Sequence, residues 1–340
     1  MRLLVLHAWM KGNLGDVLQL SVLLRALREL QPRALDLAGY PARPAPETQE
    51  VLALADRYVA DPFPWYWSLV PAPAGAGIIA PWWKRQRRAL FSRYDALVCA
   101  PGPYLADYDR RAVSALCDIA VARDLGLPVV LSSHSIGPLG SSGLAAVSKA
   151  SVRIARESTT CEYLRERGVA AVLSADYAFL YPYAGAEDVR PIEGPYRLAF
   201  LRSNNLNAKR LRIEGGALVE GSRLVAEPTA SRTVLATSDY RRDGPFLSKA
   251  ARALGVPWMA CRSVAELVQL IRGASDVVSD RYHPAICAAV LGKPAHVIPN
   301  RERHKMEGLT NLLGGASVEE LQRLARTGLD AVRGALRETV

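Results

Sequence analysis

Short apolar runs alternate with stretches of helical periodicity along nearly the whole chain, and this alternation limits the folds that it can adopt. Residues 3–7 form a mostly apolar run, which is typical of a buried strand. In the next segment, 17–30, leucine and valine recur at helical spacing, and Pro32 ends the predicted helix. A second apolar run at 34–38 completes a strand-helix-strand unit. Repeated units of this kind predict an α/β fold with helices packed on a parallel sheet.

The pattern stops and then starts again, so the chain is predicted to contain two domains. Strands and helices continue to about residue 174, and residues 183–195 are then rich in glycine, proline and acidic side chains. A second set of predicted strands and helices begins at residue 197. A length of 340 residues suits two α/β domains better than one core. We expect a first Rossmann-like domain over 1–187 and a second over 188–340.

The two predicted domains together describe the GT-B architecture, in which two Rossmann-like domains face a cleft. Ligands of open α/β sheets bind at the carboxyl ends of the strands, so the active site is expected in that cleft. A strongly amphipathic segment, 318–337, predicts a C-terminal helix that closes the second domain. Residues 61–83 are rich in proline and tryptophan and have no clear period, which predicts a long loop that acts as a lid or binds an acceptor.

The formal net charge of +10 favours anionic partners, among them a phosphorylated substrate, nucleic acid and an acidic membrane surface. The densest basic run, Lys84 to Arg88, directly follows Trp82 and Trp83. Such an arrangement suits a membrane interface or a polyanion, and it equally describes a solvated helix start beside two packed indoles. Peripheral membrane contact through Trp82 to Arg88 therefore stays open, and nucleic acid is the weaker interpretation.

Targeting, membrane-spanning and metal-binding patterns are missing from this sequence. The first apolar run is too short for a signal peptide, and no stretch reaches the roughly 20 apolar residues that span a bilayer. We therefore expect a cytoplasmic protein, with the inner membrane surface as an alternative location. The five cysteines are widely spaced and form no C-x-x-C pair, so we expect reduced thiols and no zinc site.

The loop Gly12-Asn13-Leu14-Gly15-Asp16 joins the first predicted strand to the first predicted helix. Backbone N–H groups at such a junction can face an anion, which makes Gly12, Asn13 and Gly15 candidate substrate-binding residues. Asp16 is expected at the N-terminus of the helix. The alternative is a helix cap, in which Asn13 or Asp16 accepts hydrogen bonds from the first N–H groups of the helix.

Two more loops follow predicted strands of the first domain. In the loop 101–104, Gly102 would let a substrate approach the backbone and Tyr104 would stack on a sugar, although an ordinary turn is the alternative. In the loop 132–138, His134 lies between two serines after a strand predicted to end at residue 132. A histidine at a strand end can exchange a proton near neutral pH, and a histidine that caps nearby backbone is the alternative.

The segment 279–284 follows a well-defined predicted strand and precedes an apolar helix. Arg281 offers a planar fork of donors that matches a carboxylate or a phosphate. His283 is expected at the helix N-terminus, where the helix dipole adds positive potential. Together they predict an anion site with a proton donor. The alternative is an Arg281 paired with Asp280 or Asp276, with His283 as a cap.

At these residues the chain resembles the polysaccharide pyruvyltransferase family, and the resemblance covers nearly its whole length. It depends on the order of several motifs, which are Gly12-Asn13-Leu14-Gly15-Asp16, Ser133-His134-Ser135-Ile136-Gly137-Pro138, Ala155-Arg156-Glu157-Ser158, Ala175-Asp176-Tyr177-Ala178-Phe179-Leu180, Ser279-Asp280-Arg281-Tyr282-His283 and Gly292-Lys293-Pro294 with Lys305. The resemblance implies a GT-B-like enzyme that binds phosphoenolpyruvate. Such enzymes transfer its pyruvyl group to a sugar, form a ketal across two hydroxyls and release phosphate. The family's Arg-x-His motif, which contacts phosphoenolpyruvate, falls on Arg281 and His283.

The chain departs from the family's pattern at three places. Gly102 stands between two prolines where the family has a run of glycines, and His134 stands where it often has glutamine. Tyr177 follows Asp176 where the family commonly has proline. The first two departures concern the acceptor side, so the acceptor is left open among a lipid-linked sugar, a nucleotide sugar, a polymer and a small natural product.

The resemblance also implies roles for the remaining candidates. The residues that would neutralise the two anionic groups of phosphoenolpyruvate are Arg281, Lys305, Arg202 and Arg156. His283 would be the general acid, and His134 or Asp16 would be the base for the attacking hydroxyl. The scheme needs no metal ion and no other cofactor.

Two other functions are compatible with the sequence. A GT-B glycosyltransferase that uses a nucleotide sugar would have the same fold, with Arg281 and Lys305 on a diphosphate. A basic RNA- or membrane-binding protein built around Trp82 to Arg88 would show steeply salt-dependent binding. The second of these does not explain an arginine and a histidine at a strand end.

Overall fold

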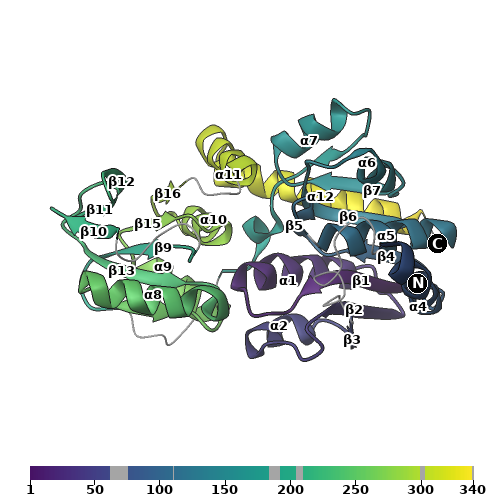
Figure 1. Ribbon diagram of the computed structural model, residues 1–340, viewed down its shortest axis with the longest axis horizontal. Helices are drawn as coiled ribbons and strands as arrows, with labels where there is room; N and C mark the ends of the chain where they lie inside the picture. Colours follow the sequence, from purple (N-terminus) through teal and green to yellow (C-terminus); the bar gives the residue numbers. More distant parts are fainter. Residues whose placement is uncertain (62–75, 110, 184–191, 204–209, 299–302, 339–340) are drawn as a thin grey trace. The chain divides into compact units, whose positions relative to one another are not determined.

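The computed structural model describes residues 1–61, 76–109, 111–183, 192–203, 210–298 and 303–338 (Figure 1). The chain forms two compact units. Unit 1 consists of Met1–Lys11, Gln19–Leu180 and Glu319–Val340, and unit 2 consists of Gly12–Leu18 and Tyr181–Val318. The expected domains, 1–187 and 188–340, stay a prediction. The two units have other bounds, since Gly12–Leu18 belongs to unit 2 and Glu319–Val340 belongs to unit 1.

Unit 1 is built on an eight-stranded sheet in which β1 and β4 lie side by side at its centre. Seven strands follow the order β3-β2-β1-β4-β6-β7-β8, β5 pairs with β6, and every pairing is parallel. The strands are β1 (Arg2–Trp9), β2 (Ala34–Tyr40), β3 (Arg57–Ala60), β4 (Ala96–Cys99), β5 (Gly102–Leu105), β6 (Val129–Ile136), β7 (Val152–Ala155) and β8 (Val172–Leu173). The predicted parallel α/β sheet is confirmed.

The helices between these strands follow the order predicted from the sequence but not the predicted lengths. Their bounds are α1 (Leu14–Arg28), η1 (Pro46–Thr48), α2 (Gln49–Leu52), α4 (Ala76–Phe91), α5 (Arg111–Asp124), α6 (Ser141–Ser148), α7 (Ser158–Arg165) and η2 (Tyr177–Leu180). The segment 142–157, whose composition favours one continuous helix, instead forms α6 and then turns into β7. The cause is the run Val152 to Ala155, whose β-branched residues fit the buried sheet better than a helix.

The C-terminal helix α12 (Val318–Arg337) packs on unit 1 and not on the unit that precedes it in the chain. Its apolar face buries Leu321, Leu329 and Leu336. At Gly328 the helix α12 lies close to Ser174. A Cβ atom built on Gly328 would lie 2.2 Å from Ser174 Oγ and 2.7 Å from Ser174 Cβ. The same serine hydroxyl lies 3.3 Å from the carbonyl oxygen of Leu324 in α12.

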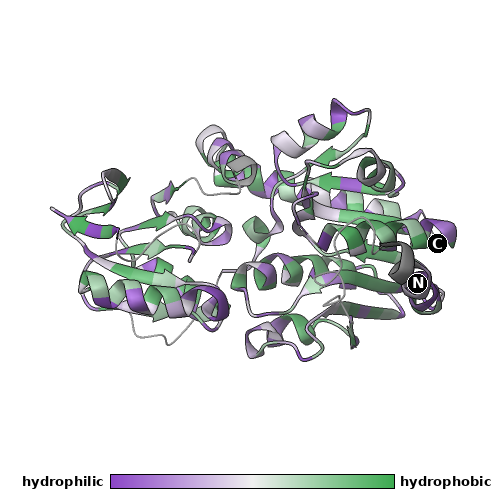
Figure 2. Ribbon diagram, viewed as in Figure 1, coloured by the Kyte–Doolittle hydropathy of each residue, from purple (hydrophilic) through white to green (hydrophobic). Residues whose placement is uncertain are grey.

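Unit 2 contains a five-stranded parallel sheet in the order β14-β13-β9-β15-β16. The strands are β9 (Tyr196–Phe200), β13 (Arg232–Thr237), β14 (Trp258–Ala260), β15 (Asp276–Ser279) and β16 (Ala295–Val297), and the helices are α8 (Tyr240–Leu254), α9 (Val264–Gly273), α10 (Tyr282–Val290) and α11 (Arg303–Gly315). A separate antiparallel sheet, which the sequence did not predict, consists of β10 (Leu211–Glu214), β11 (Ala217–Glu220) and β12 (Arg223–Ala226). Figure 2 shows the strands of both parallel sheets mainly in the colour of hydrophobic residues, as expected for sheets covered on both faces.

The strand order of unit 2 defines where a ligand is expected. From β9 the chain proceeds to β13 and β14 on one side and then returns to β15 on the other side of β9. The direction therefore reverses between β9 and β15, and open α/β sheets bind ligands at the carboxyl ends of the strands at such a point.

The close approach at Gly328 can be tested by stability measurements. Replacing Gly328 with alanine should lower the free energy of unfolding by about 1–3 kcal/mol, because the new methyl group overlaps Ser174. Gly334→Ala in the same helix is the matched control, since a Cβ atom there would meet no neighbouring side chain or strand within 4 Å. That control should stabilise the protein by about 0.5–1 kcal/mol through helix propensity. Urea denaturation followed by circular dichroism measures both, and equal effects would contradict the packing of α12 on unit 1.

Candidate functional site

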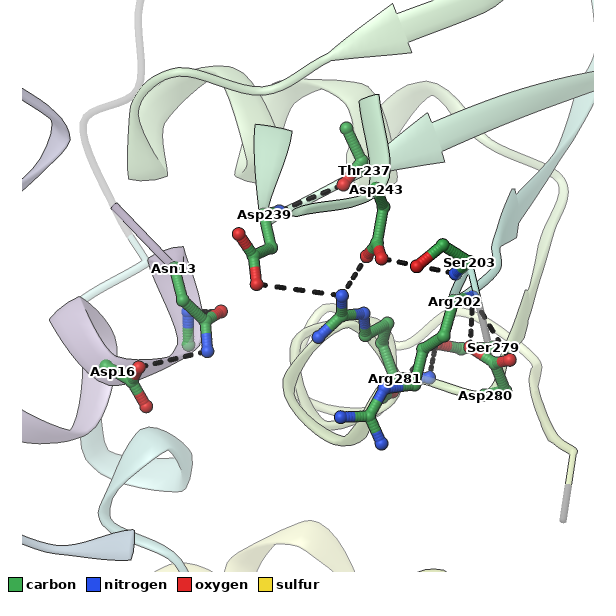
Figure 3. Close-up of polar contacts among 11 residues, drawn as sticks. Asn13, Asp16, Arg202, Ser203, Thr237, Asp239, Asp243, Ser279, Asp280 and Arg281 are labelled. Atoms are coloured by element: carbon green, nitrogen blue, oxygen red, sulfur yellow. Dashed lines mark hydrogen bonds and ion pairs between the residues drawn. The ribbon is translucent and has the colours of Figure 1, made fainter. Parts of the chain in front are cut away.

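Three neighbouring strands of unit 2 end in charged residues at the same edge of the sheet. Arg202 follows β9, Asp239 follows β13, and Asp280 with Arg281 follows β15. Because parallel strands present their carboxyl ends together, these side chains gather at the crossover between β9 and β15 (Figure 3).

The Asp280 carboxylate fastens the end of β9 to the end of β15. Its two oxygens lie 2.9 and 3.1 Å from the backbone nitrogen of Arg202, which donates to them. In return, the backbone N–H of Asp280 donates to the carbonyl oxygen of Phe200 at 3.1 Å. Asp280 is buried, and the hydrogen bonds from the backbone N–H of Arg202 stabilise its carboxylate there. Arg202 and Arg281 are thereby placed at the ends of adjacent strands.

Arg281 pairs with two carboxylates from the segment after β13. Its Nη2 forms an ion pair and hydrogen bond with the Asp243 carboxylate in α8, and it lies 3.6 Å from Asp239 Oδ2. Asp243 also accepts a hydrogen bond of 3.2 Å from the backbone N–H of Ser203. Figure 3 shows both carboxylates directed at the guanidinium group. These contacts fix the orientation of Arg281 before any ligand arrives.

The ion pairs described for Arg281 are with Asp239 and Asp243, whereas the sequence had offered Asp280 and Asp276 as alternative partners. Asp280 bonds backbone N–H groups, and Asp276 pairs with Arg197 at 2.6 Å. The true partners, Asp239 and Asp243, were not predicted from the sequence. A signal was present for Asp239, since it comes two residues after 233–237, a run rich in β-branched and apolar residues, and carries a carboxyl group to the same sheet edge.

His283 lies in the first turn of α10, one residue after its N-terminal residue. The helix begins sharply because Ser279 Oγ accepts the N–H of Arg281 at 3.0 Å and donates to the Arg281 carbonyl oxygen at 2.7 Å. Pro284 fits the first turn, where its missing N–H costs no helical hydrogen bond. Arg281 and His283 therefore lie at the positive end of the helix dipole, as predicted.

The first sequence motif belongs to the same unit. The N–H of Leu14 donates to the carbonyl oxygen of Ser238 at 2.9 Å, which attaches the start of α1 to the end of β13. A Cβ atom on Gly15 would lie only 1.9 Å from His283 Nδ1, so the absence of a side chain at Gly15 makes room for the imidazole ring. The structure thus brings together the two motifs that the sequence placed at opposite ends of the chain.

Asn13 and Asp16 are engaged in a helix cap at this point. Asn13 Oδ1 accepts the N–H of Gly15 at 3.1 Å, and Asn13 Nδ2 donates to Asp16 Oδ2 at 3.0 Å. This is the capping alternative considered from the sequence. Asp16 consequently has a structural partner, and its suggested role as a base stays a prediction. Gly12, at φ +90, makes the turn that leads into the cap.

His134, Tyr104 and Gly102 lie together in unit 1. The expectation that His134 belongs to a loop is wrong, because β6 continues to Ile136 and buries the ring completely. Its Nε2 lies 2.9 Å from Tyr104 Oη, whose O–H donates to the carbonyl oxygen of Ala100 at 2.7 Å. Gly102 is its backbone partner in the neighbouring strand β5. Burial, with a contribution from Arg156, lowers the pKa of His134 to about 3, so the ring is neutral and donates its Nε2–H to Tyr104.

Arg156 is inside unit 1. Its guanidinium bonds Ser135 Oγ at 2.7 Å and Asp176 Oδ2 at 2.9 Å, and Nε lies 3.3 Å from Glu157 Oε2. The side chain is fully buried, and its predicted contact with substrate stays a prediction. The side chain of Lys305, at the start of α11, lies outside the part that the structure describes.

The basic run of α4 is divided between the interior and the surface. Trp83 and Arg87 are buried and bind Asp118, with both Trp83 Nε1 and Arg87 Nε at 3.0 Å from Asp118 Oδ1. The exposed members of the run are Trp82, Lys84, Arg85 and Arg88. The packed-indole interpretation therefore holds for Trp83, and membrane contact through the remainder stays a prediction. None of the helices described by the structure is both long and apolar enough to cross a membrane.

Comparisons with known proteins identify the family and the fold. The family model for polysaccharide pyruvyl transferase matches residues 13–302. No curated protein matches the chain. Among solved structures, UDP-GlcNAc 2-epimerase from Methanocaldococcus jannaschii, in complex with UDP-GlcNAc and UDP, is 13% identical with a TM-score of 0.57, covering 97% of this chain and 93% of that one. MnaA from S. aureus, in a co-structure with UDP, is 13% identical with a TM-score of 0.58 and covers 98% and 89%. At these identities the likeness shows the fold alone, and it confirms the predicted GT-B-like fold.

The contact between Gly15 and His283 predicts that the effect of a substitution at Gly15 on stability depends on the residue at position 283. Gly15→Ala should lower the free energy of unfolding by about 1–3 kcal/mol, because the new methyl group overlaps the imidazole. In a His283→Ala background the overlap is gone, and the same change should be neutral or stabilise by up to about 1 kcal/mol. Thermal denaturation of the four proteins measures this double-mutant cycle. An equal cost of Gly15→Ala in both backgrounds would show that the loop does not rest on His283.

Proposed function

This chain belongs to the polysaccharide pyruvyl transferase family, and we propose that it transfers the pyruvyl group of phosphoenolpyruvate to two hydroxyls of a sugar-containing acceptor. The products are a cyclic ketal and inorganic phosphate. The observation that carries the proposal is the pairing of Arg281 and His283 at the start of α10, with Gly15 shaped to the histidine ring. An anion site beside an imidazole is what an anionic enol phosphate requires.

Arg281 and Arg202 are the proposed contacts for the carboxylate and the phosphate of the donor. They follow the adjacent strands β15 and β9, at the edge where ligands of such sheets bind. Asp239 and Asp243 hold the Arg281 guanidinium in place, so little side-chain freedom is lost when an anion binds. The start of α10 adds the positive end of its dipole to the same point. Lys305 is proposed as a third cation from the sequence resemblance alone.

His283 is the proposed general acid. A proton placed on the methylene carbon of phosphoenolpyruvate turns it into a methyl group and leaves a cationic centre at the carbon that bears the phosphate. The first acceptor hydroxyl adds to this carbon, the carbon–oxygen bond to phosphate breaks, and the second hydroxyl closes the ketal. One hydroxyl proton restores the proton given by His283, and the other leaves with phosphate. The charge changes are met by arginines and by proton transfer, so the proposal includes no cofactor.

The acceptor is proposed to be a sugar because the family acts on polysaccharides. The alternative that competes with this proposal is glycosyl transfer from a nucleotide sugar. It draws support from the bound UDP-GlcNAc and UDP in structures with the same fold. A thermal-shift comparison separates the two, since a pyruvyltransferase should be stabilised by phosphoenolpyruvate and a glycosyltransferase by UDP-GlcNAc.

The proposed roles predict distinct kinetic defects in unit 2. His283→Ala should lower the rate of phosphate release by about 10²–10⁴-fold, the usual worth of a general acid. Arg281→Lys keeps the charge but loses the planar fork, so the KM for phosphoenolpyruvate should rise roughly tenfold or more. Phosphate release is measured with phosphoenolpyruvate against a panel of sugars, with mass spectrometry of the product.

The matched control for this experiment is His296→Ala, which removes an exposed histidine of β16 in the same unit. It should retain the wild-type rate. Turnover by His283→Ala equal to that of the control would refute the role of His283. Product masses without an added pyruvyl group would refute the proposed reaction.

A further inference from the structure

The helix α4 of unit 1 has a buried face that is fixed by specific contacts. Trp83, Arg87 and Phe91 follow one another at helical spacing and are all buried, and the guanidinium carbon of Arg87 lies 4.0 Å from the centre of the Trp83 ring. Arg87 forms ion pairs with Asp118 at 3.0 Å and with Asp61 at 2.7 Å. These contacts fix the rotation of the helix about its axis, and they therefore determine which residues of the basic run are exposed.

The outer face of α4 combines an exposed indole with exposed cations. Trp82 is 45% exposed, and the basic residues that are exposed beside it are Lys84, Arg85 and Arg88. Trp82, Arg85 and Arg88 recur at i, i+3 and i+6, so they lie along one side of the helix. The helix contains no acidic residue. The outer face is therefore apolar at Trp82 and positively charged over the turns that follow.

Little of this positive charge is neutralised by the protein itself. Among the residues that the structure describes, neither Lys84 nor Arg85 forms an ion pair. Arg88 lies 3.4 Å from Asp124 in α5, but both side chains are about half exposed, and such pairs are weak and screened by salt. The end of α5 also exposes Arg123, which offsets the charge of Asp124. The outer face therefore keeps a net positive charge that is available to a partner.

The chemistry of this face fits an anionic lipid surface better than a nucleic acid. The sequence of α4 is apolar from Ala76 to Trp83 and basic from Lys84 to Arg88. Tryptophan rings favour the boundary between hydrocarbon and water, and nearby lysines and arginines keep their apolar stems there while their charges reach the lipid phosphates. Single-stranded nucleic acids instead stack successive bases on several aromatic rings, and Trp82 is the one exposed ring among the described side chains of α4.

We infer that the outer face of α4, formed by Trp82, Lys84, Arg85 and Arg88, is a docking surface for a bilayer that contains anionic lipids. The indole lies at the depth of the lipid headgroups, and the three cations bind lipid phosphates. Each cation near such a surface raises the affinity roughly fivefold, so the three together raise it on the order of 100-fold. The binding is reversible, because one helix face lies on the bilayer and does not span it. The inference does not depend on the proposed pyruvyl transfer, since α4 contains none of the residues assigned to the donor.

Vesicle flotation with the full chain measures this binding. Mixed vesicles of phosphatidylcholine and phosphatidylglycerol in equal parts should carry the wild-type protein upward in a density gradient, and vesicles of phosphatidylcholine alone should not. Raising the NaCl concentration from about 0.05 M to about 0.5 M should release most of the bound protein, because the cations are exposed and their charges are screened. Equal binding to both kinds of vesicle, or binding to neither, would overturn the inference.

A combined variant tests the cations of the outer face. Lys84→Gln, Arg85→Gln and Arg88→Gln, made together, should lower the affinity for the mixed vesicles by about 100-fold, because each change removes a factor of roughly five. The three side chains are exposed, so the variant should keep the fold of the wild type, which circular dichroism checks. An affinity equal to that of the wild type would show that the cations of α4 do not contact the lipid.

The matched control removes the same number of charges from another helix of unit 1. Arg323→Gln, Arg326→Gln and Arg337→Gln together neutralise three exposed arginines of α12. Exposed carboxylates of Glu319 and Asp330 accompany them on that helix and offset their charge. The control should therefore bind the mixed vesicles within about twofold of the wild-type affinity. An equal loss of binding in both combined variants would mean that net charge drives binding, and the inference would fail.

Trp82→Ala tests the apolar part of the outer face. Because nearly half of this residue is exposed, losing its burial among the headgroups should lower the affinity for the mixed vesicles roughly fivefold. Its control is Tyr108→Ala, which removes an aromatic ring that is 67% exposed elsewhere in unit 1 and should leave binding unchanged. If Trp82→Ala binds as tightly as Tyr108→Ala, the indole is not at the bilayer and the proposed face is wrong.

A competition experiment distinguishes the bilayer from a nucleic acid as the occupant of this face. Poly(U) RNA, added at the same concentration of phosphate groups as the mixed vesicles, should leave the wild-type protein bound to the vesicles. Displacement by poly(U), together with loss of poly(U) binding in the combined variant of Lys84, Arg85 and Arg88, would assign the face to nucleic acid and overturn the inference.

Discussion

A single backbone hydrogen bond, from the N–H of Leu14 to the carbonyl oxygen of Ser238, attaches the start of α1 to the sheet edge of unit 2. The segment Gly12–Leu18 belongs to unit 2, while the remainder of the helix belongs to unit 1. It also brings Gly15 against the His283 ring, where no larger residue fits. The motifs Gly12–Asp16 and Ser279–His283 are therefore in contact in three dimensions, although they are far apart in the sequence.

The sequence predicted the fold well because the relevant signal is local. Apolar runs and helical spacing are properties of a few consecutive residues, and they indicated both parallel sheets and the positions of Arg281 and His283 at the start of a helix. The errors arose where distant parts of the chain decide the outcome. His134 was expected in a loop, but pairing with β5 and β7 extends its strand. The C-terminal helix follows the second predicted domain in the sequence, and its apolar face packs on unit 1 through contacts that no local pattern encodes.

The charged partners of the site were hidden for the same reason. Arg281 pairs with Asp243, and Arg87 pairs with Asp61 and Asp118, across sequence separations that no local pattern encodes. In each unit one arginine thus lies between two carboxylates. A buried arginine requires such partners, since an unpaired buried charge costs several kcal/mol. Composition revealed an excess of basic residues, but it could not show which of them face inward.

The arginine clusters around Arg281 and Arg87 differ in the bonding of the second carboxylate oxygen of one aspartate, which is Asp243 in unit 2 and Asp118 in unit 1. In unit 2, Asp243 uses both oxygens, one on Arg281 and one on the backbone N–H of Ser203, so the cluster fixes the arginine that is proposed to bind the donor. In unit 1, Asp118 Oδ1 accepts from Arg87 and Trp83, and among the residues that the structure describes Oδ2 has no hydrogen-bond donor and lies 3.6 Å from His7 Nε2. A carboxylate with one committed and one uncommitted oxygen can stabilise a proton arriving on its neighbour. The same arrangement of an arginine and two aspartates therefore orients a cation in unit 2 and leaves a buried carboxylate oxygen beside a histidine in unit 1.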